Sequence, residues 1–463
     1  MGLVQGRETI EIMRAAVSPG QPQLDEEARQ LLSEATRSLL ASHQNGGVEQ
    51  QRFLEIGRRQ LCLPAEALDA WLRGARILVT GGTGCIGSTL IGKLAEMGSA
   101  QVVSVSRGEA KAWPRREGVD YRHADIRDRR ALDRLLSDVR PDVVFHLAAQ
   151  RDPGAAETEV HRTVTTNVLG TRNVLAAAVQ AGVSQVVCAS TGKALRPYSP
   201  DVYTASKRAA EWLAADAAAR HGLRIAAARF THVVDNSLIY LRLLHWVQGG
   251  MIRLHSPDIS FYAQSALESA QLLLVAGLAS RPGRFRVHAI TDLGWPICLL
   301  DLTLDVLARA GSATPVYFSG YPRGYEEFPF PGLYDPATAG EVSPLLNAFE
   351  AGQASRSACP MVDAAPVLMV PDPAAAELLA GLEKGCERTQ DPAVSRGLLD
   401  ELSWSLLHIT LKAAPSSALA RMAAQAARYR DVLNGTHYRV LHAISETVRE
   451  DTRRDLAQPS PGH

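Results

Sequence analysis

The chain has 463 residues, which is enough for two or three compact domains or for one core with large extensions. Lysine and arginine together number 49, as do aspartate and glutamate, so no excess of charge favours nucleic acid or an anionic membrane as a partner. The six cysteines lack CxxC spacing, and no stretch of about 18 uncharged apolar residues occurs. We therefore expect a soluble cytoplasmic protein with free thiols, without a signal sequence and without a membrane partner.

The first 74 residues carry apolar side chains at helical spacing. Leu31, Leu32 and Ala35 recur on one helical face, and the residues from 53 to 72 continue the pattern. Three or four short helices are predicted, separated by breaks that contain proline, glycine or asparagine. No charged constellation in this part suggests chemistry, so we expect a helical extension that packs on the core or on a second subunit.

Residues 75–97 have the pattern of a strand, a phosphate-binding loop and a helix. An apolar run ends at Gly81, and Gly84 and Gly87 follow with the spacing GxxGxxG. Glycines at these positions allow a tight turn, close approach of the backbone to a pyrophosphate, and close packing of the helix on the strand. The amides at the start of the helix would then hold the phosphates of a dinucleotide. The residues of this stretch expected to bind the cofactor are Gly81, Thr83, Gly84, Cys85, Ile86 and Gly87.

The end of the second strand, at 101–106, should lie beside the adenosine ribose of such a cofactor. NAD-binding proteins usually place an acid there, whereas an arginine accommodates the extra phosphate of NADP. Ser106 and Arg107 take that place here, so the sequence favours NADP over NAD, unless Arg107 is only a solvated surface charge. After a third short strand, Asp125 and Ile126 could meet the adenine edge with a carboxylate and an apolar contact.

Two more strands continue an alternation of strands and helices. The strand at 143–147 ends in small residues that would let the cofactor come close, and the strand at 185–190 follows a helix. This alternation predicts an α/β fold with a doubly wound parallel sheet of the Rossmann type, in which ligands lie beyond the carboxyl ends of the strands. The further residues assigned to the cofactor in this part are Ala148, Ala149, Arg151 and Asn167.

The candidate catalytic residues follow the strand at 185–190. Tyr203 and Lys207 are four residues apart and share one face of a helix. An ammonium placed in this way lowers the pKa of the phenol and can hold the nicotinamide ribose, so that the tyrosine can move a proton. Ser190 or Thr191 would hydrogen-bond the reacting oxygen of the substrate. The alternative interpretation is a tyrosine and a lysine that only pack on the sheet.

A series of motifs keeps one order along the chain: VTGGTGCIGSTL, SRGEAKAW, HADIRD, FHLAAQR, TNVLGTRNV, ASTGKALRP, YTASKRAAEW, ARFTHVV, HSPDISFYAQSALESAQLLL and FSGYPRGYEE. With these motifs the chain resembles an extended short-chain dehydrogenase/reductase. Within that superfamily it is similar to the polysaccharide-biosynthesis branch, which contains the UDP-N-acetylglucosamine 4,6-dehydratases. The resemblance covers Arg76 to Glu327, and the use of NADP by several members fits the interpretation of Arg107.

The segment after the fifth strand departs from this family. The dehydratases carry Ser-Thr-Asp-Lys there, and the acid helps to expel water while the lysine takes part in proton removal. The resemblance therefore assigns proton removal to Lys193, but Gly192 stands at the acid position, and two extra residues separate Lys193 from Tyr203. A standard 4,6-dehydration lacks its expected general acid, unless another group such as Asp201 supplies it.

The motifs that face the substrate in the family are also changed. Its Arg-Phe-Gly-Asn appears as RFTH at 229–232, its Thr-Arg-Tyr-Phe as SFYA at 260–263, and its Arg-Pro-Gly-Glu-Lys as PRGYE at 322–326. The cofactor half thus matches the family while the substrate half is rewritten, which implies a redox site acting on a different substrate or with a different outcome. His232 could equally be a buried core residue rather than a substrate contact. The candidate substrate contacts are Ser190, His232, Asn236, Tyr262 and Arg323.

The last third of the chain carries little chemistry. The stretches 329–338 and 351–373 are rich in proline, glycine, serine and alanine and are expected to be loops or a linker. Helical periodicity returns between 374 and 448, and the histidines there lack the spacing of a helical metal site, so no metal is expected. The expected parts are a helical N-terminal extension (1–74), a core with a cofactor part (75–230) and a smaller substrate-binding part (231–330), and a C-terminal extension of loops and helices (331–463).

The leading hypothesis is an NADP-dependent epimerase or dehydratase that acts on a nucleotide-activated sugar or similar polyol through transient oxidation of a hydroxyl. Tyr203 and Lys207 would drive the oxidation, and Lys193 would remove a proton beside the resulting ketone. One alternative is an NADPH-dependent ketoreductase or dehydrogenase of specialised metabolism. Another is a non-catalytic cofactor-binding scaffold, for which Gly192 and the rewritten substrate motifs argue. A homo-oligomer is also expected.

Overall fold

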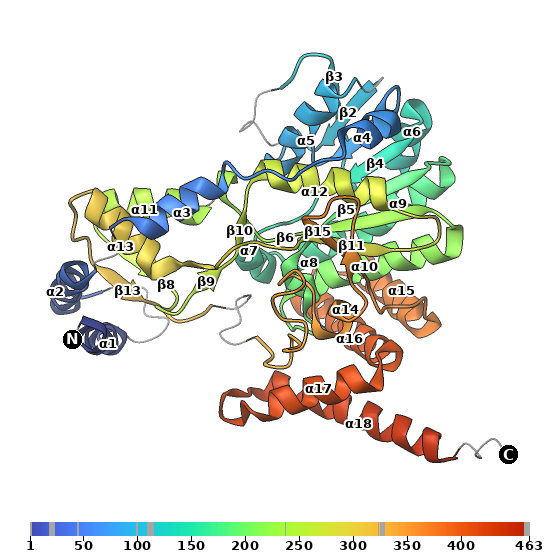
Figure 1. The fold of residues 1–463 in the computed structure, drawn as a ribbon. Coiled ribbons are helices and arrows are strands. Elements are labelled where there is room, and N and C mark those ends of the chain that lie inside the picture. Colours follow the sequence, from blue (N-terminus) through green and yellow to red (C-terminus); the bar gives the residue numbers. More distant parts are fainter. Residues whose placement is uncertain are drawn as a thin grey trace. The chain divides into compact units, whose positions relative to one another are not determined.

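The computed structural model describes residues 2–17, 24–43, 46–98, 101–108, 115–236, 238–322, 324 and 329–457. The chain folds into two units, each built from three separate segments (Figure 1). The larger unit comprises Leu61–Phe230, Ser269–Asp292 and Phe328–His463, and the smaller unit comprises Met1–Gln60, Thr231–Glu268 and Leu293–Glu327. No helix in these described ranges is long and apolar enough to cross a membrane.

A nine-stranded sheet, counted over the described residues, organises the larger unit. Its strand order is β14, β15, β11, β6, β5, β4, β1, β2, β3. The first six strands and β11 pair in parallel, so the expected doubly wound sheet is confirmed. The strand order reverses at β1, which lies between β2 and β4, and ligands of such sheets bind beyond the strand ends at this point. The bounds are β1 (Arg76–Thr80), β2 (Gln101–Ser106), β3 (Val119–His123), β4 (Val143–His146), β5 (Gln185–Thr191), β6 (Arg224–Phe230), β11 (Arg286–Ile290), β14 (Ser355–Arg356) and β15 (Val362–Pro366).

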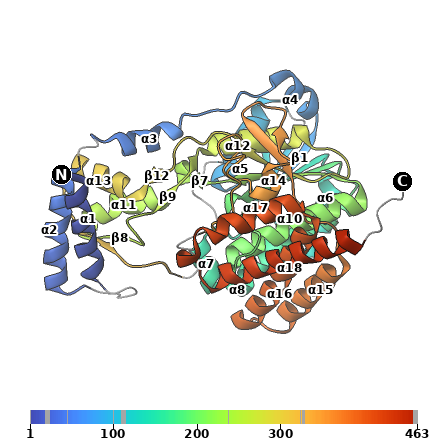
Figure 2. The ribbon, with the colours of Figure 1, turned by 60° about the horizontal axis from the view of Figure 1, so that its bottom comes forward.

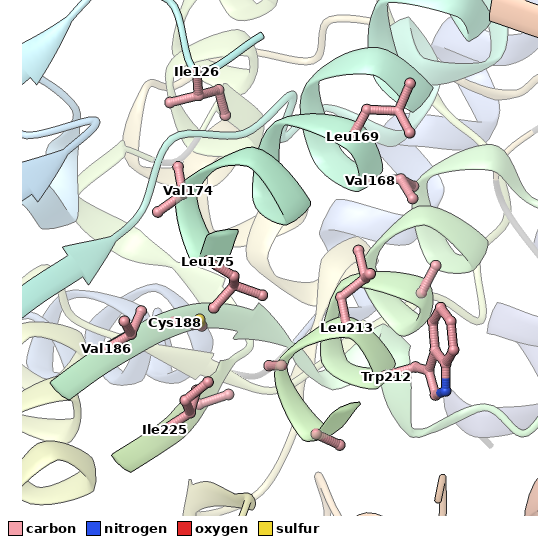
Figure 3. Close-up of a cluster of buried hydrophobic side chains, with 14 of the residues drawn as sticks. Ile126, Val168, Leu169, Val174, Leu175, Val186, Cys188, Trp212, Leu213 and Ile225 are labelled. Atoms are coloured by element: carbon pink, nitrogen blue, oxygen red, sulfur yellow. The ribbon is translucent and has the colours of Figure 1, made fainter. Parts of the chain in front are cut away.

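Helices cover the sheet and bury its apolar side chains. Figure 3 shows Val186 and Cys188 of β5 and Ile225 of β6 close to Leu175 and Leu213 from the covering helices. Apolar residues on these strands therefore read as nearly continuous runs, as is usual for parallel strands covered on both faces. The helices are α4 (Ala65–Leu72), α5 (Cys85–Glu96), α6 (Arg129–Val139), α7 (Pro153–Thr158), α8 (Val160–Val164), the π-helical turn η1 (Thr165–Leu169), α9 (Gly170–Gln180), the 3₁₀ turn η2 (Gly192–Leu195), α10 (Val202–His221) and α12 (Ala266–Ala279).

One edge of the sheet comes from a stretch that we expected to be a loop. Within residues 351–373, β15 pairs antiparallel with β11, and β14 pairs antiparallel with β15. Val362, Ala364 and Ala365 are buried in this pairing. The loop prediction was wrong for 362–366 because small residues fit a covered strand as readily as they fit a loop, and only the pairing with the neighbouring strand β11 decides between the two.

The chain after β15 forms helices that pack on the sheet's own helices. Figure 2 shows α16 beside α10 and α8, with α15 and α18 next to α16. The helical prediction for this tail is confirmed, and aspartates cap the first two of its long helices at Asp372 and Asp391. The bounds are α14 (Ala348–Ala351), α15 (Pro373–Arg388), α16 (Pro392–Ala413), α17 (Ser416–Ala427) and α18 (Gly435–Ala457).

The smaller unit joins the N-terminal helices to the part expected to bind substrate. Both α1 and α2 pack on β13, and α3 packs on α13. The expected N-terminal helices are thus present, but α4 belongs to the larger unit, where the Trp71 ring lies against Gly277 of α12. The bounds are α1 (Gly2–Ala15), α2 (Glu26–Ser42), α3 (Val48–Ile56), β7 (His232–Val233), the 3₁₀ turn η3 (Val234–Asn236), α11 (Leu238–Gly249), β8 (Ile252–Leu254), β9 (Ser260–Phe261), β10 (Ala263–Gln264), β12 (Ile297–Cys298), α13 (Leu299–Arg309) and β13 (Val316–Phe318).

Candidate active site

The loop after β1 leaves space that only glycine allows. Gly81 has φ +73°, and a Cβ there would lie 2.8 Å from the amide nitrogen of Ala148. A Cβ on Gly87 would lie 2.3 Å from the carbonyl oxygen of Gly81. Gly84 is the N-cap of α5 and brings no side chain to the helix start, so the first-turn amides face outward from the helix. This bare helix start fits the phosphates of a dinucleotide, as the sequence predicts. The other three loop residues, Thr83, Cys85 and Ile86, lie between these glycines.

A buried chain of hydrogen bonds holds the ends of β1 and β4 together. The amides of Leu147 and Ala148 donate to the Thr80 hydroxyl, which lies 2.8 Å from His146 Nδ1. His146 Nε2 lies 3.0 Å from Thr171 Oγ1, and that hydroxyl donates to the Asn167 carbonyl. Burial lowers the pKa of His146 to about 3, so the imidazole is neutral. It therefore donates from Nε2 and accepts the Thr80 proton at Nδ1, which fixes the small residues Ala148 and Ala149 beside the glycine loop.

At the ends of β2 and β3 the residues expected beside the adenosine occupy neighbouring positions. The charge of Arg107 acts on Asp125 and helps to lower its pKa. Burial alone would raise the pKa of Asp125, but hydrogen bonds from Arg127 outweigh it. Ile126 is buried against Gly170, where a Cβ would lie 2.8 Å from the isoleucine Cδ1. The Ser106 hydroxyl accepts from the Gly108 amide in the same turn.

Asp125 also borders a polar cavity of about 650 Å³. The cavity lies between α6, the α8–α9 segment and α15, and Tyr203, Thr191 and Lys207 are not among its lining residues. Several of the charged groups along it are paired, as in the bidentate contact of Arg172 with Glu383 and the ion pair of Arg127 with Asp125. We therefore place the chemistry at the carboxyl ends of the strands rather than in this cavity.

The predicted catalytic residues meet at the end of β5. Thr191 lies close enough to Tyr203 to lower the pKa of the phenol, and Lys207 Nζ donates to the Ala189 carbonyl at 2.7 Å. Burial raises the pKa of Tyr203 above its ordinary value of 10, and Thr191 and the Arg151 charge offset this only in part. Burial likewise lowers the pKa of Lys207. The expected lowering of the phenol's pKa by this ammonium is therefore not seen, because burial is the largest effect on Tyr203 and Lys207 is not among the groups that act on it.

The two hydroxyls predicted to meet the substrate point to different partners. Ser190 donates to Glu211 at 2.6 Å, inside a fully buried network, whereas Thr191 lies beside Tyr203. In that network Arg229 makes paired hydrogen bonds to Glu211 and to Glu350. Of the two hydroxyls, Thr191 is therefore the one in contact with the tyrosine.

Gly192 is packed against a residue from far along the chain. A Cβ at Gly192 would lie 2.7 Å from Leu345 Cδ2, so a larger side chain at this position meets an occupied space. Lys193 follows in η2, where its amide donates to the Thr191 hydroxyl. Asp201, the alternative acid, lies 3.4 Å from Arg196 Nη1 in an ion pair. Leu345 lies outside every motif, and nothing in the local sequence signals its contact with Gly192.

Asn167 links the cofactor side of the site to the catalytic helix. It lies in the π-helical turn η1, accepts from the Gln150 amide, and donates to the Gln150 carbonyl and to Ser206 Oγ. Arg151, the next residue after Gln150, is exposed, and its charge acts on Tyr203. Asn167 therefore holds the loop after β4 against α10, which carries Tyr203 and Lys207.

The predicted substrate contacts other than Ser190 belong to the smaller unit. The ring of His232 lies 4.8 Å from that of Phe261, and burial lowers its pKa to about 4. The carbonyl of Tyr262 accepts from the Thr231 hydroxyl. Asn236 ends η3, but its side chain lies outside the described residues, as does the whole of Arg323. Their role in substrate binding stays a prediction.

Comparison with known proteins agrees with this geometry. Residues 77–323 match the family model described as "Polysaccharide biosynthesis protein". The probable polysaccharide biosynthesis protein EpsC of Bacillus subtilis is 27% identical over 290 residues, and the capsular polysaccharide biosynthesis protein CapD of Staphylococcus aureus is 26% identical over 291. Each alignment covers 59% of this chain and 48% of the relative, so the chain spans about half the length of these curated relatives.

A solved structure shows the same fold. The X-ray structure of Pen from Bacillus thuringiensis aligns with a TM-score of 0.55 at 22% identity, over 65% of this chain and 90% of that one. At this identity the likeness bears on the fold alone. Together with the parallel sheet, the glycine loop and the family match over more than half of the chain, it leads to one conclusion. The protein belongs to the polysaccharide biosynthesis protein family.

Proposed function

We propose that the protein is an NADP-dependent enzyme that epimerises a nucleotide-activated sugar through transient oxidation of a sugar hydroxyl. The observation that carries this proposal is the proximity of Tyr203 to Thr191 at the carboxyl end of β5, with Lys207 one helical turn further along α10. A proton-transfer group at this edge of a dinucleotide-binding sheet suits oxidation of an alcohol. Relatives support it, since the UDP-glucose 4-epimerase of Rickettsia canadensis is 27% identical over 271 residues, 76% of its length.

The residues around the β1 loop fit a dinucleotide. The glycine backbone would hold the pyrophosphate, Asp125 and Ile126 would meet the adenine, and Arg107 would meet the extra phosphate that distinguishes NADP from NAD. Lys207 would hold the nicotinamide ribose. When bound, NADP supplies an acceptor and donor of hydride for the sugar carbon.

The protein's own part in the reaction is to move protons. Tyr203, as the phenolate, takes the proton of the hydroxyl that is oxidised and gives it back when the ketone is reduced, so the net balance is zero. Thr191 hydrogen-bonds the same oxygen and orients it. Lys193 removes a proton from the carbon next to the ketone in outcomes that need it, because the ketone makes that carbon acidic.

The contact of Gly192 with Leu345 favours epimerisation over dehydration. Loss of water needs an acid to protonate the departing hydroxyl, and the family's acid position holds glycine here, with its space filled by an apolar side chain. Asp201, which could replace that acid, is ion-paired with Arg196. A ketoreductase that consumes NADPH is favoured by the same contact, because it also needs no departing water.

The test is incubation of the enzyme with a panel of nucleotide sugars in heavy water, followed by mass spectrometry and proton NMR. We expect a stereoisomer of unchanged mass, or of one added mass unit where Lys193 acts, and NADP in the cofactor released from the purified protein. Tyr203→Phe should lower the rate by at least about 10²-fold, since it removes the proton acceptor. It should leave the melting temperature within a few degrees of that of the wild type.

Other results would redirect or sink the proposal. Loss of about 18 mass units would show that dehydration proceeds without an acid at position 192. Stoichiometric loss of NADPH absorbance with a carbonyl substrate would favour the ketoreductase. Wild-type turnover in Tyr203→Phe would contradict the mechanism, and bound NADP without conversion of any sugar would favour the scaffold.

A further inference from the structure

The loop between β5 and α10, residues 192–201, is attached to the C-terminal extension at its first turn. Gly192 packs under Leu345, whose carbonyl accepts from Arg229 at 2.9 Å. Asn347 Nδ2 donates to the Leu195 carbonyl at 2.7 Å, and its Oδ1 caps α14 by accepting from two amides there. Asn347 is 2% exposed, so the bond to the loop is shielded from water.

A second attachment lies at Tyr198, in the middle of the same loop. Its hydroxyl donates to Asp400 of α16, and its ring meets that of Trp404 edge-on at 4.9 Å. Arg439 of α18 lies over the Trp404 ring, 4.5 Å from its centre. Tyr198 is 6% exposed, so its side chain is buried against the C-terminal extension although it belongs to a loop.

The extension also reaches the start of the helix that carries Tyr203 and Lys207. Glu157 accepts from the Val202 amide at the N-terminus of α10 and is itself bound by Arg396 of α16 at 2.7 Å. Further along α10, Arg208 donates to the Ala194 carbonyl of the loop and to Thr410 of α16. Helix α16 thus supports both the middle of the loop, at Tyr198, and the helix that follows it.

We propose that the C-terminal extension positions the active site, with Tyr198 and Asn347 as positioning residues. Thr191 and Lys193 precede the loop or begin it, whereas Tyr203 and Lys207 follow it, so their mutual geometry depends on how the loop is held. A loop that connects these groups has many conformations open to it, and each fixed point reduces their number. The inference rests on the proposed function for its catalytic consequence, but not for the structural coupling itself.

The test uses the full chain and two variants that each remove one attachment. Tyr198→Phe deletes the bond to Asp400 and keeps the ring contact with Trp404. Asn347→Ser keeps a favourable helix cap but removes the amide nitrogen that donates to the Leu195 carbonyl. The matched control is Tyr438→Phe, which removes an exposed hydroxyl bonded to the Arg430 carbonyl on the same extension. The readouts are hydrogen exchange of peptides covering 191–201, calorimetric binding of NADP, and kcat and KM for the converted sugar.

Both loop variants should exchange amides in 191–201 at least about ten-fold faster than the wild type, with no change in α17 peptides. Their kcat should fall by about 10- to 100-fold, because small misplacements of reacting groups are costly. KM and NADP affinity should stay within about three-fold, a split that general destabilisation would not produce. Tyr438→Phe should match the wild type throughout.

Wild-type exchange in both variants would overturn the proposal, as would unchanged kcat in a variant whose loop exchanges faster. The two proposals fail separately. If the wild type converts no sugar, the proposed function fails, and the exchange data alone decide whether the extension holds the loop.

Discussion

Gly192 and Leu345 share one packed contact at the start of the loop that follows β5. Gly192→Asp would place a Cβ 2.7 Å from Leu345 Cδ2 and bring a carboxylate into an apolar contact. We expect it to lower the free energy of unfolding by about 1–3 kcal/mol, as overpacking does. Leu345→Ala alone should cost about 2–5 kcal/mol through the cavity it leaves.

The double variant separates a steric conflict from independent damage. Because alanine at 345 makes room for the aspartate, the combined loss in urea unfolding should be smaller than the sum of the two single losses. Additive losses would show that Gly192 and Leu345 do not share one space.

Tyr203 is the residue whose pH behaviour the structure constrains most. Burial raises its pKa above the ordinary value of 10, and a base acts only in its deprotonated form. We therefore expect the rate of sugar oxidation to rise roughly ten-fold per pH unit between pH 7 and 9, without a plateau. Initial rates with a saturating substrate check this. A plateau below pH 8 would contradict this expectation. It would indicate that Lys207 lowers the pKa of the phenol, as the spacing of the two residues predicts.

Among the elements, the short helix α14 supplies a carboxylate to a buried group of charges. Its Glu350 faces Arg229, which has no exposed surface, and that arginine also pairs with Glu211. Burial alone would raise the pKa of Glu211, but the charge of Arg229 and the hydrogen bonds outweigh it, so the net shift is downward. Glu211, Arg229 and Glu350 therefore form a buried ionic group, in which each charge is stabilised by an opposite charge.

Removing one carboxylate from this group leaves a buried cation underpaired. We expect Glu350→Ala to lower the free energy of unfolding by about 3–5 kcal/mol, measured by urea denaturation. Glu341→Ala removes an exposed carboxylate just before the same segment and should stay within about 0.5 kcal/mol of the wild type. Equal stabilities of the two variants would contradict a structural role for the ionic group.

Elements with a local signal were predictable and those defined by distant partners were not. The glycine loop can be recognised because backbone geometry requires its spacing. Tyr203 and Lys207 can be recognised because residues four apart share one face of a helix. Leu345 and Asn347 contact residues that are distant in the chain, so neither belongs to a recognisable sequence pattern. β15 was missed for the same reason, since its alanines form a strand through their pairing with β11.

At the scale of the whole molecule, both units are assembled from segments that the chain order separates. The N-terminal helices complete the smaller unit, where Arg59 binds Glu268 and donates to the carbonyls of Ala263 and Leu293. An amphipathic helix shows in sequence that it has a partner, but not which partner. The sequence analysis therefore predicted these helices without identifying the unit they join.

The position of β15 at the sheet edge has a consequence for biosynthesis. A ribosome adds roughly 5–20 residues per second, so β15 emerges roughly 4–15 s after β11. Until then β11 presents an unpaired edge, and α10 lacks its contact with α16. The nascent chain is thus open to mispairing during this interval, and a chain that ended before β15 would keep the open edge.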